Sequence, residues 1–215
     1  MKKILAMMMA VMMMFSLAAC GNSNKETEAP TEAPTEAPTE APTEAELAYK
    51  SAEELLKLLM DSYNATATDE TKLYVSGGNI NNFDTTNPEG PAKFVALEDA
   101  DYDTNLGYPT ADVAKLDDAA SMFNMMNVNV FNCYAVHFTN SADVDAMAET
   151  IKANILNRQW ICGSPEKLVI AKMPGDYLVV VWGAVEFGGI VDPFVASIAD
   201  AVEGTTLLVE HSFAQ

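Results

Sequence analysis

Side chains suited to catalysis at neutral pH are scarce in this sequence. Its 215 residues include two histidines, His137 and His211, and three cysteines. There is no Gly-x-Ser-x-Gly, His-Glu-x-x-His, P-loop or dinucleotide-binding fingerprint. Cys133 and His137 lie four residues apart on a predicted strand, a span of about 13 Å, which is too long for a nucleophile and its base. The sequence therefore shows no familiar signature of an enzyme.

Basic residues are also few. The chain has 12 lysines and arginines against 31 aspartates and glutamates, which gives a formal net charge of −19. From position 47 onward there are nine basic and 24 acidic residues. Such a charge repels nucleic acid and anionic headgroups, so we expect no nucleic-acid partner. Solubility alone explains the charge; a cationic partner, or metal ions held loosely in a cell wall, is the alternative.

The apolar stretch at residues 4–15 is too short to span a bilayer, which takes about 20 residues. It follows Lys2 and Lys3 and precedes small residues, a pattern typical of a secretory signal peptide. Residues 17–20, Leu-Ala-Ala-Cys, resemble the lipobox of bacterial lipoproteins position by position. The resemblance implies that residues 1–20 are a lipoprotein signal peptide. It also implies that Cys20 carries a lipid anchoring the chain in the cell membrane, on its extracytoplasmic face. A transmembrane helix is the alternative.

A low-complexity segment follows at residues 21–46, in which Thr-Glu-Ala-Pro occurs four times in succession over 27–42. Proline at every fourth position excludes a helix, and the repeat has nothing apolar to bury. Extended at about 3.1 Å per residue, the segment would reach roughly 80 Å. We expect a disordered tether that holds a single domain, residues 47–215, away from the lipid. A ligand or glycan-acceptor role for the repeat is the alternative.

Hydrophobic periodicity predicts the helices and strands of this domain. Ser51 and Glu54 form a capping box in front of leucines at helical spacing. The predicted helices cover 47–63, 110–118, 142–159 and a last helix that Asp192 caps and that ends before Gly204. The predicted strands cover 127–138, 166–173, 177–183 and an edge strand at 205–210, with two short strands at 72–75 and 93–97. The apolar residues 122–126 are expected to pack beneath the sheet.

The order of the strands follows from burial and connection rules. Residues 178–182 are apolar at consecutive positions, which favours the most buried strand. The helix between strands 127–138 and 166–173 makes them parallel, and the hairpin at 174–176 places strand 177–183 between them. We therefore expect an α+β fold, a small two-layer domain. Its split β-α-β sheet has the order 127–138, 177–183, 166–173, with helices packed on it.

An acidic loop offers a weak calcium candidate. Four oxygen-bearing residues fall at positions one, three, five and twelve of an EF-hand loop. They are Asp101, Asp103, Asn105 and Asp112. Leu106 stands where that loop needs glycine, so a solvated acidic loop is the interpretation we favour. We expect no other metal site and no cofactor.

Cys133 and Cys162 are a candidate disulfide once Cys20 is lipidated, because the predicted compartment permits disulfides. Closing a loop of about 30 residues would stabilise the fold by roughly 3–4 kcal/mol. Two unpaired thiols are the alternative.

Aromatic residues and one histidine are the remaining candidates. Trp160, Trp182, Tyr177 and Phe187 either line a ligand groove or, as we favour, close the core. His137 is expected at the sheet edge or under a helix.

Residues 108–201 share several features with a known family. These are a short acidic helix before an Asn-rich strand, a helix start at 139–143, a helix end at 157–159 and the strand at 175–181. On these features the chain resembles the DUF4358 domain of bacterial lipoproteins, found mostly in clostridial-type Firmicutes. The resemblance implies a location in the cell envelope and supplies no mechanism.

Two classes of function remain. We expect a membrane-anchored extracytoplasmic lipoprotein whose domain is a non-catalytic binding or assembly module, with an envelope protein or wall component as partner. The alternative is a small envelope hydrolase or a solute-binding accessory subunit.

Overall fold

The computed structural model describes residues 47–79, 88–95, 101–124, 130–161, 164–186 and 189–214. The predicted signal peptide (1–20) and tether (21–46) lie outside this part of the chain, so both stay predictions. No helix within the described ranges is both long enough and apolar enough to cross a membrane.

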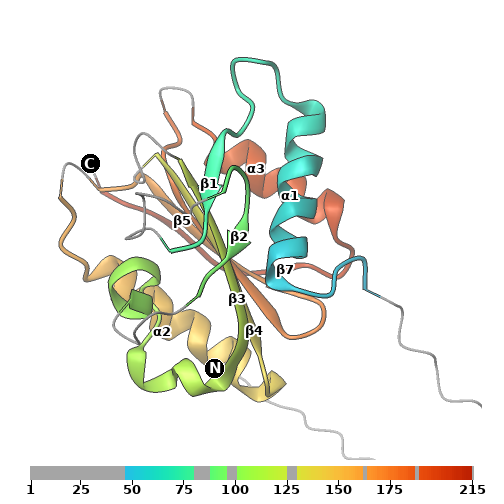
Figure 1. Ribbon diagram of the computed structural model, residues 1–215. Coiled ribbons are helices and arrows are strands. Elements are labelled where there is room, and N and C mark those ends of the chain that lie inside the picture. The colour runs from blue at the N-terminus through green and yellow to red at the C-terminus, as the bar shows by residue number, and fades with distance from the viewer. Residues whose placement is uncertain are drawn as a thin grey trace, which may run out of the picture. The chain divides into compact units, whose positions relative to one another are not determined.

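Seven strands of the described chain form one antiparallel sheet (Figure 1). Its order is β1-β3-β4-β6-β5-β7, and β2 also pairs with β3. The strands are β1 (Val75–Gly77), β2 (Ala92–Lys93), β3 (Leu116–Asn124), β4 (Phe131–Phe138), β5 (Lys167–Met173), β6 (Tyr177–Gly183) and β7 (Thr206–Ser212). The predicted α+β class and the predicted order of the three central strands are confirmed, with β6 antiparallel to β4 and to β5. The predicted edge strand is β7, beside β5.

Three α-helices of the described chain cover the sheet: α1 (Ala52–Thr66), α2 (Val144–Leu156) and α3 (Val191–Ala201). Shorter turns are η1 (Tyr102–Leu106), η2 (Thr110–Lys115) and η3 (Ser141–Asp143). Ser51 caps α1 as predicted, because its hydroxyl accepts the Glu54 backbone N–H at 3.1 Å. The Glu54 carboxylate accepts the backbone N–H of Lys50 at 2.8 Å, one residue before the partner that a capping box requires. Asp192 lies in the first turn of α3 and is not its cap.

Helices cover both faces of the sheet, so the domain has three layers and the expected two-layer arrangement is wrong. Alternate residues of each central strand enter two separate cores. Cys133 and Ala135 of β4 face the core that contains α1 and α3, whereas Tyr134 and Val136 face the core that contains α2. All seven residues of β6 are buried, which explains its unbroken apolar sequence.

Strand β3 is the main element that the sequence did not predict. The expected helix at 110–118 ends as η2 at Lys115, and residues 116–124 join the sheet between β1 and β4. Residues 122–126 were expected beneath the sheet, but Met122 lies within β3 and pairs with Cys133. The middle of β3 is buried on both faces, so it lacks the alternation that marks a half-exposed strand.

Candidate functional site

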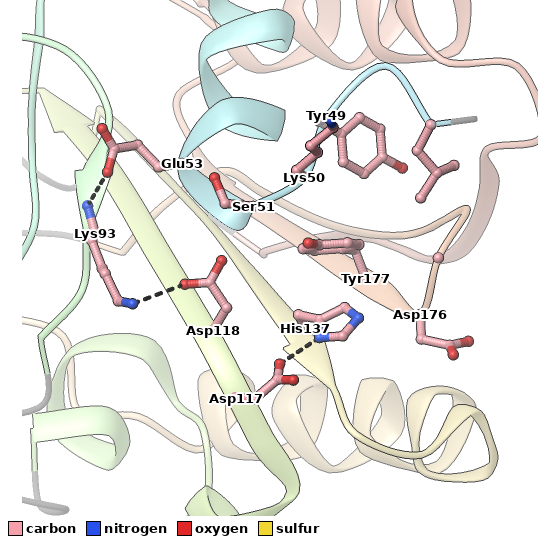
Figure 2. Close-up of a pocket in the computed structure, with 12 residues that line it drawn as sticks. Tyr49, Lys50, Ser51, Glu53, Lys93, Asp117, Asp118, His137, Asp176 and Tyr177 are labelled. Atoms are coloured by element: carbon pink, nitrogen blue, oxygen red, sulfur yellow. Dashed lines mark hydrogen bonds and ion pairs between the residues drawn. The ribbon is translucent and has the colours of Figure 1, made fainter.

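An open pocket of about 670 Å³ lies at the end of the sheet where β4 ends and β6 begins (Figure 2). The chain before α1 and its first turn form one wall, and β2, β3, β4 and the β5–β6 hairpin form the rest. The lining residues are Leu47, Tyr49, Lys50, Ser51, Glu53, Lys93, Asp117, Asp118, His137, Gly175, Asp176 and Tyr177.

A β-bulge places two consecutive carboxylates in this pocket. The register pairs Leu116 with Phe138 and Asp118 with His137, so Asp117 is an extra residue in β3. In a regular strand, neighbouring side chains point to opposite faces of the sheet. Because the bulge breaks that alternation, Asp117 and Asp118 both line the pocket.

His137 and Asp117 form a hydrogen-bonded pair between Nδ1 and Oδ1. This pairing leaves Nε2 as the ring nitrogen available to a ligand (Figure 2). The imidazole also lies against the Tyr177 ring, with 4.5 Å between the ring centroids. Of the two positions expected for His137, the sheet edge is wrong, because β4 has a neighbour on each side. His137 lies at the end of β4, in the pocket that the start of α1 also lines.

The Asp118 carboxylate connects three elements. One oxygen accepts the backbone N–H of Ala52 at 2.7 Å, in the first turn of α1, and the other lies 3.6 Å from the Lys93 ammonium. Glu53 of α1 in turn accepts the Lys93 backbone N–H at 3.2 Å. A carboxylate near a helix N-terminus is stabilised by the unpaired N–H groups there. These contacts hold the start of α1 over the end of the sheet.

Two tyrosines supply the aromatic surface. The Tyr49 and Tyr177 rings meet edge to face, with 5.3 Å between centroids, and the Tyr49 hydroxyl donates to the Pro174 carbonyl at 2.7 Å. Burial raises the pKa of each phenol to about 12, and for Tyr177 the nearby carboxylates of Asp118 and Asp117 add to the rise. Both hydroxyls therefore stay protonated at neutral pH and act as hydrogen-bond groups rather than as bases.

The β5–β6 hairpin closes the far side of the pocket. Gly175 and Asp176 both adopt positive φ, 74° and 62°. The Asp176 carbonyl accepts the Phe138 backbone N–H at 3.0 Å, which ties the turn to the end of β4. A side chain at position 175 would collide with Leu47, so the hairpin touches the chain just before α1.

The arrangement suits binding of a positively charged group better than covalent catalysis. Among the described residues that line the pocket, Ser51 alone has an alkyl hydroxyl, and that hydroxyl already caps α1. Four carboxylates line the pocket against two lysines, Lys50 and Lys93. Carboxylates together with tyrosine faces attract ammonium and guanidinium groups.

The residues of the calcium candidate do not share one set of contacts. Asp101 accepts a hydrogen bond from Asn79 at 3.1 Å, whereas the Asp112 carboxylate pairs with Lys115 at 2.9 Å. Asn105 is buried beside Asn79, and Asp103 lies in η1. Within the described ranges, no group of three or more His, Cys, Asp or Glu side chains is placed to hold a metal ion.

The cysteine predictions stay untested. Cys133 is buried in β4, and burial raises the pKa of its thiol. Cys20 and Cys162 lie outside the described residues.

Of the four aromatic candidates, Trp182 is buried, Trp160 is partly buried and Tyr177 lines the pocket. Phe187 lies outside the described residues.

Sequence reasoning missed Tyr49, Asp117 and Asp118. The two aspartates were assigned to the end of a helix, so nothing placed them beside His137. The signal that could have found them is the acidic pair directly before a run of small and apolar residues at 119–123.

Comparison with family models finds no match, and comparisons with curated proteins and with solved structures find none either.

Proposed function

We propose that this protein is a lipoprotein anchored through Cys20 on the extracytoplasmic face of the cell membrane. In this proposal the domain is a non-catalytic binding module for an envelope protein or a wall component. The observation that carries it is the pocket in which Tyr49, Tyr177 and His137 meet the bulge carboxylates Asp117 and Asp118.

The charge of the pocket favours a cationic group on the partner. Four of the lining side chains are carboxylic acids: Glu53, Asp117, Asp118 and Asp176. Two lysines, Lys50 and Lys93, also line the pocket and offset part of this charge, so the carboxylates outnumber the lysines by four to two. The Lys93 ammonium lies 3.6 Å from the Asp118 carboxylate. An ammonium over a tyrosine face gains about 0.5–2 kcal/mol, and the carboxylates add a longer-range attraction that steers association.

Features outside the described residues support the location. The lipobox at 17–20 provides the site of the lipid anchor, and the repeat at 27–42 allows the domain to extend away from the membrane. A long tether is most useful to a module that binds a fixed partner, such as a wall polymer or a second surface protein. Membership of the DUF4358 lipoproteins is part of the same proposal.

The His137–Asp117 pair favours hydrolysis as a second candidate function. Asp117 holds Nδ1, so Nε2 is oriented as a base that could activate water against a bound substrate. Substituting His137→Gln in the purified protein separates the two candidates. Loss of turnover on wall or peptide substrates, with the fold intact, would establish the hydrolase and exclude the non-catalytic module.

Site-specific photocrosslinking on intact cells tests the binding module. A photoreactive residue in place of the exposed Lys93 should give a defined adduct with an envelope component. The matched control replaces Glu149, which is equally exposed on α2, on the other face of the sheet. The adduct should weaken at high salt and with Asp117→Asn, because both changes reduce the attraction of the carboxylates. Equal labelling from both positions would contradict the proposal.

A further inference from the structure

A second cluster lies on the opposite face of the sheet, at the other end of β4. Four buried polar atoms there have no hydrogen-bond partner: Asn132 Oδ1, Tyr134 Oη, Trp160 Nε1 and Trp182 Nε1. Asn132 pairs with Trp182 across β4 and β6, and Tyr134 follows on the same face. The Trp182 ring centroid lies 6.0 Å from that of Tyr134 and 6.3 Å from that of Trp160. The four side chains therefore form one contiguous group.

These atoms need a partner that the described part of the chain does not provide. A buried polar group left without a hydrogen bond destabilises the fold, and such groups are rare in native proteins. Here two indole N–H groups and one phenol can donate, whereas Asn132 Oδ1 can only accept. Donors predominate, so the missing partner carries acceptor oxygens.

Arg158 adds a positive charge to the same cluster. Its guanidinium lies 4.7 Å from the centroid of the Trp160 ring. It is the only arginine in a sequence with 31 acidic residues, yet it forms no ion pair with any described carboxylate. Partial burial lowers its pKa, because the charge has lost part of its hydration. A half-buried guanidinium that has no counter-ion among the described residues is suited to an anionic ligand.

We propose that Arg158, Trp160, Trp182 and Tyr134 form a second binding site, for a small carboxylate with an apolar body. Arg158 and Trp160 are partly exposed and form the entrance, whereas Trp182 and Tyr134 are buried and form the floor. The guanidinium and the N–H and O–H donors bind the carboxylate. The partly buried rings of Trp160 and Phe213, whose centroids lie 6.3 Å apart, contact the apolar body. This site does not depend on the pocket that contains His137.

Tryptophan fluorescence tests the proposal, because the sequence has two tryptophans and both belong to the cluster. The probe is cyclohexanecarboxylate, which does not absorb where indole is excited. The control is cyclohexylmethanol, which has the same body without the charge. The full-length protein should show a saturable emission change with the acid and none with the alcohol. Arg158→Gln should weaken binding about tenfold or more, since a charge-assisted contact is lost.

Tyr134→Phe gives a second variant that keeps the shape of the core. It removes a hydroxyl that has no partner, so it should weaken binding of the acid without lowering the thermal stability of the ligand-free protein. The matched control is Tyr108→Phe in the same core, whose hydroxyl already donates to the Asp112 carbonyl at 3.0 Å. It should bind the acid like the wild type.

Three results would overturn the proposal. The first is no saturable emission change with the acid, which would mean that ordered water alone satisfies the four atoms. The second is equal binding of the acid and the alcohol. The third is unchanged affinity in Arg158→Gln.

Discussion

Asp118 and Ala52 are separated by 66 positions in the chain, yet the Asp118 carboxylate accepts the Ala52 backbone N–H at 2.7 Å. The contact joins β3 to the first turn of α1. It satisfies one of the N–H groups that a helix leaves unpaired at its start. The position of α1 over the pocket therefore depends on a carboxylate that also belongs to the pocket.

Asp118→Asn should lower the free energy of unfolding by about 1–2 kcal/mol, because it removes the charge from a contact with a helix N-terminus. Urea denaturation measures this. Asp117→Asn is the matched control, since its side chain is 55% exposed against 18% for Asp118. It should change stability by less than about 0.5 kcal/mol. Equal losses in the two variants would show that the Ala52 contact is not the cause.

Gly175→Ala should destabilise the domain by about 1–2 kcal/mol, because a side chain is strained at this positive φ. The new methyl group would also displace Leu47. The comparison is Asp176→Asn, the neighbouring residue at φ 62°, where asparagine accommodates the left-handed conformation well. Thermal unfolding should show little change for Asp176→Asn. If Gly175→Ala unfolds at the wild-type temperature, the described turn geometry is wrong.

Stability should fall at alkaline pH because of Tyr49 and Tyr177. Each phenol has a pKa of about 12 in the folded protein and 10 as the ordinary value. The unfolded chain therefore loses these protons first, and it gains stability relative to the folded state as the pH rises. The contribution is complete below pH 10 and is lost as the pH rises through about 12.

Urea denaturation across this pH range, in the wild type and in Tyr49→Phe, measures the effect. Tyr49→Phe should lose less stability between pH 10 and about 12, because the titration of Tyr49, whose pKa is raised in the folded protein, is absent. Tyr74→Phe is the control: the Tyr74 side chain is 64% exposed, so this variant should follow the wild type. Identical pH profiles for all three proteins would contradict the assignment.

Cys20→Ala should release the protein from membranes, because the lipobox resemblance places the lipid on the Cys20 sulfur. Cell fractionation followed by detection of the protein is the measurement. Cys133→Ala is the control and should stay with the membrane fraction, since Cys133 is buried in β4. Retention of Cys20→Ala at the membrane would exclude lipid anchoring through this residue.

The sequence predicted the centre of the fold well, because the signals there are local and strong. The apolar run at 178–182 identified the central strand, and Pro174 and Gly175 identified the turn before it. The capping residue Ser51 does precede α1, although the predicted helix, 47–63, began five residues too early and ended three residues too early. Such features depend on neighbours in the chain and need no knowledge of the tertiary structure.

The candidate site could not be predicted in the same way. Its geometry depends on β3, a strand whose middle is buried on both faces, and on a β-bulge that no residue pattern in the sequence predicts. The sequence drew attention to His137, but the partner considered for it was Cys133, on the same strand. Its partner, Asp117, comes from the adjacent strand, 20 positions away. Pairing across a sheet follows from register, and register follows from the whole fold.

The bulge at Asp117 has a consequence for how the pocket tolerates change in chain length. Deleting one residue at 117 would let β3 and β4 pair without interruption, and the remaining aspartate would keep its place opposite His137. The sheet would survive such a deletion, whereas the imidazole would lose its carboxylate. A relative of this protein with a regular β3 would thus keep the architecture without the His–Asp pair. The length of one strand, more than the identity of any side chain, distinguishes a chain with this site from one without it.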